Sequence, residues 1–91
     1  GEREHIMSLV FAVEEVIREV MEPDKVNLAT LGNMVPHIHW HVIPRYQDDA
    51  YFPGSPWSAK VRETSKASLE ARRLLAKRLP EVIRDAISQM Y

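Results

Sequence analysis

The chain of 91 residues contains no cysteine, no signal-like basic and apolar leader, and no run of about 18 apolar residues. The first absence excludes a disulfide framework, and the other two give no sign of export or of a membrane span. We therefore expect a cytoplasmic protein with no membrane partner.

An excess of charge of one sign is also missing, because 12 Lys and Arg residues stand against 13 Asp and Glu residues. Nucleic-acid-binding domains usually carry a basic patch or stripe. The basic pairs Arg72-Arg73 and Lys77-Arg78 recur at helical spacing on an expected solvent face. We therefore expect no nucleic-acid partner.

The hydrophobic fraction of 45% describes one small domain, residues 1–91, with a thin core. Apolar residues recur at three- and four-residue steps from Ile6 to Val20, with charged residues between them. This pattern predicts an amphipathic helix. The helix should end near Met21, because Pro23 disfavours helical backbone at the residue before it.

Further elements follow from composition and from breaker residues. We expect two antiparallel strands, then a loop rich in proline, then helices; in order, these are strands over 25–31 and 35–43, a loop over 46–65 and a helix over 67–79. Pro80 should either kink that helix or open a second one over 81–90. The order predicts an α+β fold.

Three of the four histidines, His37, His39 and His41, occupy every second position of an otherwise apolar run. Successive side chains of a strand point to opposite faces, so the three imidazoles share one face and the apolar residues between them share the other. One face should pack, and the other should be available for chemistry.

Three interpretations of this pattern stay open on the residues alone. The histidines could form an ordinary wet face, ligate a metal, or act in covalent catalysis. A metal is the weaker choice, because the outer pair starts about 13 Å apart and needs further ligands. The chain offers no Cys, and no Glu occurs between Glu22 and Glu63.

The segment 37–43, His-Ile-His-Trp-His-Val-Ile, resembles the signature of the histidine triad family, in which histidines alternate with apolar residues. Its surroundings agree: Asn27 precedes the middle histidine at the expected distance, 32–35 stands where a phosphate-binding turn is expected, and Pro44-Arg45 follows. The resemblance extends from about Glu2 to Trp57.

This resemblance implies a nucleotide hydrolase or nucleotidyltransferase that cleaves a nucleoside phosphate anhydride, ester or phosphoramidate through a nucleotidyl-histidine. His39 would be the nucleophile, His41 would bond phosphate oxygens or assist the leaving group, and His37 would orient the triad. No metal or cofactor is expected. The substrate would be a nucleotide or a dinucleoside polyphosphate. The alternative is a non-catalytic nucleotide-binding or structural remnant.

The resemblance also assigns phosphate contacts to Asn27, Gly32, Asn33 and Met34. Glycine permits close backbone approach to a ligand, and backbone N–H groups can bind phosphate oxygens. Taken alone, Gly32-Asn33 is ordinary turn chemistry, and Asn27 is a strand residue bonded within its sheet.

Family members carry an antiparallel sheet with further strands before this opening helix, so we expect a truncated domain with a helical C-terminal extension over 58–91. A two-stranded hairpin with helices is marginally stable alone, which favours a homodimer. The aromatic residues Tyr51, Phe52 and Trp57 should anchor the loop that follows the strands, cover the site, or form a partner surface.

Overall fold

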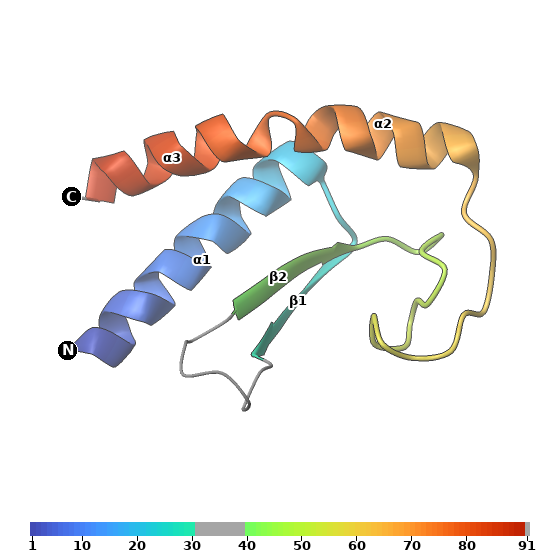
Figure 1. Ribbon diagram of the computed structural model, residues 1–91, viewed down its shortest axis with the longest axis horizontal. Helices are drawn as coiled ribbons and strands as arrows, with labels where there is room; N and C mark the ends of the chain where they lie inside the picture. The colour runs from blue at the N-terminus through green and yellow to red at the C-terminus, as the bar shows by residue number, and fades with distance from the viewer. Residues whose placement is uncertain (31–39, 91) are drawn as a thin grey trace.

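The computed structural model describes residues 1–30 and 40–90, and its elements follow the α+β order expected from the sequence (Figure 1). Helix α1 spans Glu2–Met21, strand β1 spans Lys25–Thr30 and strand β2 spans Trp40–Arg45. Helices α2, Lys66–Ala76, and α3, Leu79–Met90, complete the chain. The α+β prediction is confirmed.

Helix α1 ends where the proline rule predicts. Glu22 adopts a left-handed conformation with φ 47° and ψ 54°, and its N–H donates to the carbonyl of Arg18 at 3.2 Å. Pro23 disfavours the right-handed helical region at the residue before it. The chain therefore turns at Glu22 and enters β1.

The two strands pair antiparallel, with Lys25 opposite Arg45 and Thr30 opposite Trp40. β2 continues two residues past the expected end at Ile43, through Pro44. Within the described residues the sheet has two strands, so β2 is an edge strand, and an edge strand tolerates a proline.

The predicted helix over 67–79 ends earlier, at Ala76, and this is a correction to its boundary. The N–H groups of Lys77 and Arg78 bond to carbonyls three residues back, which tightens the chain into a turn. Pro80 then lies in the first turn of α3. Backbone N–H groups in the first turn of a helix have no acceptor within that helix, so a proline there removes no helical hydrogen bond. Of the two expectations for Pro80, the second helix is confirmed.

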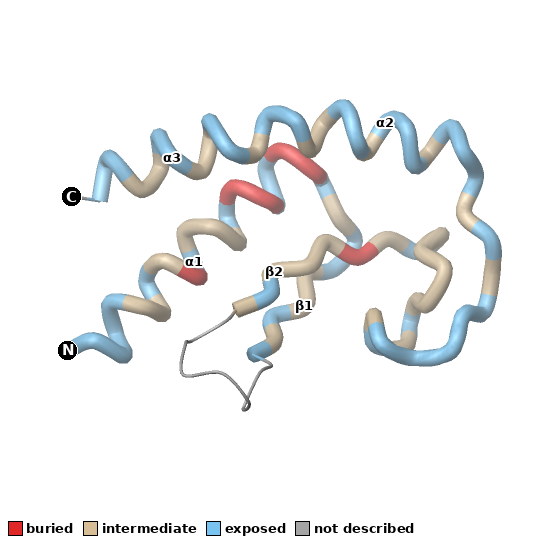
Figure 2. Tube along the Cα trace, in the orientation of Figure 1, coloured by how far each residue is buried: buried red, intermediate tan, exposed pale blue. Residues whose placement is uncertain are grey.

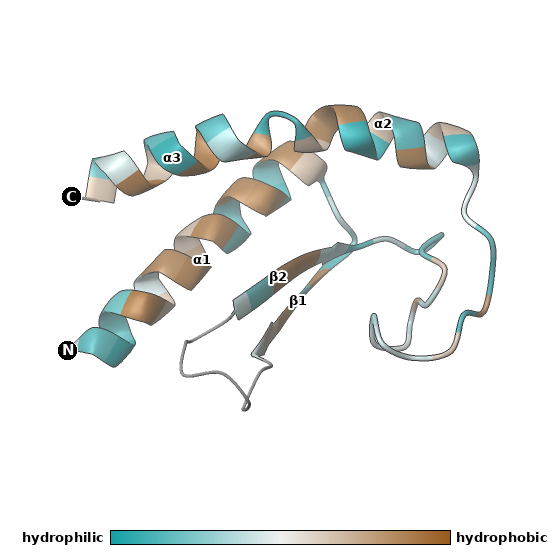
Figure 3. Cartoon of the chain, viewed as in Figure 1, coloured by the Kyte–Doolittle hydropathy of each residue, from teal (hydrophilic) through white to brown (hydrophobic). Residues whose placement is uncertain are grey.

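The core lies at the C-terminal half of α1, where four of the buried residues that the structure describes form a cluster (Figure 2). Val16, Ile17, Val20 and Met21 form it, and side chains of β1, β2, α2 and α3 pack against them. In Figure 1, α2 and α3 follow each other along one side, and the C-terminal end of α1 meets their junction. Apolar residues accordingly mark α1 and β2 in Figure 3.

The helices cover one face of the hairpin. Val26 and Val42 pack against the core cluster, and Trp40 lines a pocket together with Ile6 and Met7 of α1. Side chains alternate along each strand, so the residues between these apolar positions point away from the helices. This confirms, for the described part of β2, that the Trp40 and Val42 face packs.

Candidate active site

His41 is the triad histidine that the structure describes, and it lies on the face of β2 turned away from α1. It stands opposite Ala29 in the register, and its side chain is exposed. An exposed imidazole on an uncovered strand face can reach a ligand without moving the core. His37 and His39 lie outside the described residues.

A cleft of about 310 Å³ opens between β1 and the loop that follows the strands, and one of its lining residues, Trp57, contacts His41. Asn27, Leu28 and Ala29 form one wall, and residues 53–57 form the other. This volume falls at the lower end of the range for small-molecule pockets, about 300–1,000 Å³.

Trp57 connects the loop wall to the histidine. Its ring lies 5.9 Å from the His41 ring, centroid to centroid, with the planes at 86°. The indole remains 57% exposed, so most of its surface is available to a ligand. Aromatic faces of this kind stack readily on planar rings.

Asn27 is the one predicted phosphate-binding residue that lies in the described structure, and its amide oxygen accepts a hydrogen bond from Arg45 Nη1 at 2.5 Å. It is bonded within its sheet, as expected for a strand residue, and it also lines the cleft. Gly32, Asn33 and Met34 lie outside the described residues.

Arg45, at the end of β2, is 2% exposed and was not expected from the sequence to organise the site. Its guanidinium also donates to the carboxylate of Asp49 and to the carbonyl of Gly54, both at 2.7 Å. Partial burial opposes ionisation of Asp49, but the bonds from Arg45 and the Tyr51 N–H outweigh it. They hold the pKa of that carboxyl below its usual range. The Pro44-Arg45 pair after the triad was the available signal.

The three aromatic residues of the loop differ in their surroundings. Phe52 is half-buried, with the Arg45 guanidinium 5.8 Å from its ring centroid, so it anchors the loop. Tyr51 is half-buried, and its N–H donates to Asp49. Trp57 instead lines the cleft beside His41.

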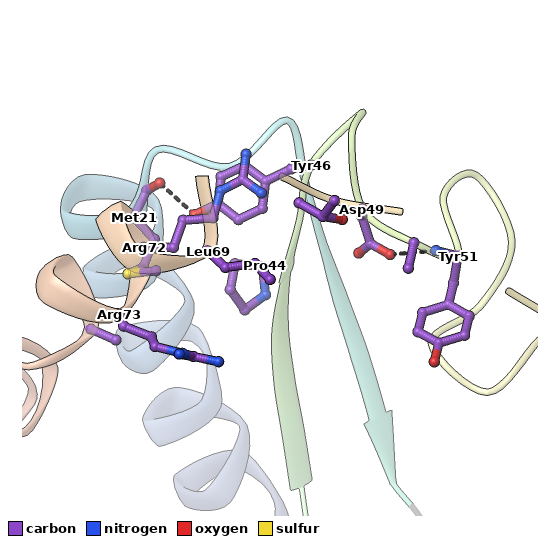
Figure 4. A pocket seen from close by; sticks show the side chains of 11 residues that line it. Met21, Pro44, Tyr46, Asp49, Tyr51, Leu69, Arg72 and Arg73 are labelled. Atoms are coloured by element: carbon purple, nitrogen blue, oxygen red, sulfur yellow. Dashed lines mark hydrogen bonds between the residues drawn. The ribbon is translucent and has the colours of Figure 1, made fainter. Parts of the chain in front are cut away.

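A second pocket, of about 440 Å³, lies where α2 meets the packed face of the hairpin (Figure 4). There the Arg72 guanidinium stacks 3.7 Å from the ring centroid of Tyr46 and donates to Asp48 at 2.7 Å. Burial raises the pKa of Tyr46 despite the nearby Arg72 cation, and its hydroxyl donates to the Met21 carbonyl at 2.6 Å. Pro44 lines this pocket, which places it on the face opposite His41. We assign no catalytic or binding role to this second pocket.

Two further findings, on metal ligands and on membrane-spanning helices, apply to the described residues. Within 1–30 and 40–90, no group of three His, Cys, Asp or Glu side chains could hold a metal ion. In the same part of the chain, no helix is long and apolar enough to cross a membrane.

Comparison with known proteins gives the family. The model of the HIT domain matches residues 1–48. Two crystal structures of histidine triad proteins are similar in fold. One, from Marinobacter aquaeolei VT8, has 32% identity and a TM-score of 0.64, and the match covers 93% of this chain and 61% of that one.

The other, from Bradyrhizobium japonicum, has 28% identity and a TM-score of 0.61, with 92% of this chain and 58% of that one covered. The chain thus spans about three fifths of the length of each. Among curated proteins it has no match. The family match extends over more than half of the sequence and includes the whole triad segment, through His41 to Arg45. The chain therefore belongs to the HIT-domain, or histidine triad, family.

Proposed function

We propose that this protein is a nucleotide hydrolase or nucleotidyltransferase that works through a nucleotidyl-histidine at His39. The observation that carries the proposal is His41, a triad histidine exposed on the open face of β2 beside a cleft. Family membership supports nucleotide chemistry at the level of the family. The specific reaction and its substrate are part of the proposal.

In the first step, a neutral ring nitrogen of His39 attacks the phosphorus of the nucleotidyl group. A P–N bond forms to His39, and the bond from phosphorus to the leaving oxygen or nitrogen breaks. The leaving group takes its electron pair and accepts a proton, which an imidazole such as His41 can donate.

In the second step, water attacks the same phosphorus, the P–N bond to His39 breaks, and a nucleoside monophosphate is released. The proton lost by water returns to the histidine that protonated the leaving group. In a transferase, another nucleophile replaces water. This cycle uses imidazoles and N–H donors, and it needs no metal or cofactor.

Phosphate oxygens would be held by the amide of Asn27 and by the backbone of Gly32, Asn33 and Met34. His37 would orient the triad. The position of Asn27 on the cleft supports its part in this arrangement. Hydrogen-bond donors aimed at those oxygens stabilise the charge that develops on them in the transition state.

We also propose a cytoplasmic homodimer. A sheet of two strands is marginally stable by itself. Apolar side chains such as Phe11 and Leu74 are 50% and 63% exposed, which supports contact with a second copy.

The test is release of nucleoside monophosphate from an adenosine phosphoramidate and from diadenosine polyphosphates, with the intact mass of the quenched protein measured in parallel. Wild type should turn over and carry a nucleotidyl adduct. His39→Ala should do neither while remaining folded. His5→Ala, on α1, serves as the matched histidine control and should behave as wild type.

Retained turnover in folded His39→Ala would contradict the proposal. Folded wild type that binds AMP without turnover or adduct would instead be a nucleotide-binding protein of the family. Activity abolished by EDTA and restored by zinc would favour the metal interpretation of the histidines.

A further inference from the structure

Arg45 is a buried cation that connects β1, the turn after β2 and the loop beyond that turn. From the end of β2 its guanidinium donates to Asn27 on β1, to Asp49 in the turn after β2, and to Gly54 in the loop. The side chain is 2% exposed. Only one of the three acceptors, Asp49, carries a charge, so an ion pair alone does not account for the arrangement.

The contact with Asn27 determines which end of that amide faces the cleft. A guanidinium has donors and no acceptor, so it can pair only with the amide oxygen of Asn27. The Nδ2 hydrogens must then point elsewhere. Asn27 lines the cleft beside His41, and within the described residues Nδ2 makes no hydrogen bond. The amide therefore offers two donors to a ligand there.

The contact with Gly54 fixes the opposite wall. Arg45 Nη2 holds the Gly54 carbonyl at 2.7 Å, in the segment 53–57 that lines the cleft. The backbone is packed closely at this point: a Cβ on Gly54 would lie 2.7 Å from Ser58 Oγ and 3.1 Å from the Tyr51 carbonyl. The same segment carries Trp57, whose ring meets His41.

We propose that Arg45 is a positioning residue for phosphate binding: by holding the amide oxygen of Asn27 and the carbonyl of Gly54, it turns the Asn27 Nδ2 donors toward the phosphate oxygens and fixes the Trp57 wall. This inference rests on the proposed function. Arg45 contacts no substrate itself and acts through Asn27 and the loop. The competing explanation is that Arg45 only stabilises the fold through Asp49.

Substitutions at Asn27 separate these two explanations. Asn27→Asp keeps an acceptor for Arg45 and removes both amide donors. If Asn27 serves only the fold, this variant should keep its melting temperature and its activity. If the amide donors bind phosphate, kcat/KM should fall about tenfold to a hundredfold while the melting temperature is held.

A double-mutant cycle then tests whether Arg45 acts through Asn27. Arg45→Lys keeps the charge but cannot reproduce the planar three-way fork. It should lower kcat/KM about tenfold or more in the wild-type background and less than about threefold in Asn27→Ala, because the donor it positions is then absent. Arg72→Lys, on the opposite side of the hairpin, is the matched control and should leave kcat/KM near the wild-type value.

Equal losses from Arg45→Lys in both backgrounds would overturn the proposal, as would equal losses from Arg45→Lys and Arg72→Lys. A second readout does not need turnover. The side-chain amide signals of Asn27 in an NMR spectrum should shift when AMP is added to wild type, and much less in Arg45→Lys. If wild type lacks turnover but these signals shift, the proposed reaction fails, while the phosphate contact of Asn27 that Arg45 positions is retained. If AMP leaves them unmoved, the inference fails, whether or not the protein turns over.

Discussion

The imidazole of His41 and the indole of Trp57 meet edge to face, 5.9 Å apart between centroids, although one belongs to β2 and the other to an irregular loop. The contact places an aromatic side chain that is mostly exposed next to a histidine of the triad. Because the loop also lines the cleft, any ligand that reaches His41 from this side passes Trp57.

Trp57→Ala should raise KM for an adenine nucleotide substrate about tenfold, because a base that stacks on an aromatic side chain loses that contact. Trp57→Phe should recover much of the loss. Trp57→Ala should lower kcat/KM without changing the melting temperature, since the indole is 57% exposed. Equal KM values for wild type and Trp57→Ala would exclude Trp57 from ligand binding.

Gly54→Ala should lower kcat/KM several-fold. The added Cβ would lie 2.7 Å from Ser58 Oγ, which can rotate away, and 3.1 Å from the Tyr51 carbonyl, so the backbone must give by a few tenths of an ångström beside the carbonyl that Arg45 holds. Gly1→Ala, whose added Cβ would have no atom of the described residues within 4 Å, provides the comparison. Steady-state kinetics decide the outcome, and wild-type kinetics in Gly54→Ala would show that the loop position is unimportant for turnover.

Asp49→Asn should lower the free energy of unfolding at pH 7 by about 2 kcal/mol, because the buried Arg45 loses its charged partner. The folded-state pKa of Asp49 is depressed. Its ionised form therefore stabilises the fold above the unfolded pKa of about 3.9, and the contribution is lost as pH falls through the lower folded value.

Urea unfolding at pH 7 and at about pH 3 measures this contribution. The difference between wild type and Asp49→Asn should shrink at the lower pH, because the carboxyl is then largely protonated in the unfolded state and part of its stabilising contribution is lost. Asp85→Asn, at an exposed position of α3, should show no such convergence. A gap between wild type and Asp49→Asn that is the same at both pH values would contradict the role of the charge.

Ile17→Ala should cost about 3 kcal/mol of unfolding free energy, since Ile17 is 5% exposed at the centre of the core cluster. Glu19→Ala, on the same helix but at an exposed position, should change stability by less than about 0.5 kcal/mol. Chemical denaturation of both variants gives the comparison. Similar losses would mean that the core does not lie where α1 meets α2 and α3.

Local patterns in the sequence predicted most of the elements. The three- and four-residue spacing of apolar positions gave α1, and Pro23 gave its end, because both act within one or two turns of chain. Alternation along β2 likewise separated the packed Val42 from the exposed His41. The strand and helix ends near Pro44 and Ala76 were displaced by two or three residues, since pairing and turn contacts decide them.

The sequence by itself thus determined the family signature, the order of helices and strands, and which face of β2 packs. Only the tertiary structure decided that Arg45 would hold Asn27 and Gly54 together, and that Trp57 would lie against His41. The physical reason is the separation along the chain between the residues that are in contact. Periodicity reports on neighbours along one element, whereas these contacts depend on how the irregular loop after β2 folds back over the open face of the hairpin, and no local repeat encodes that path.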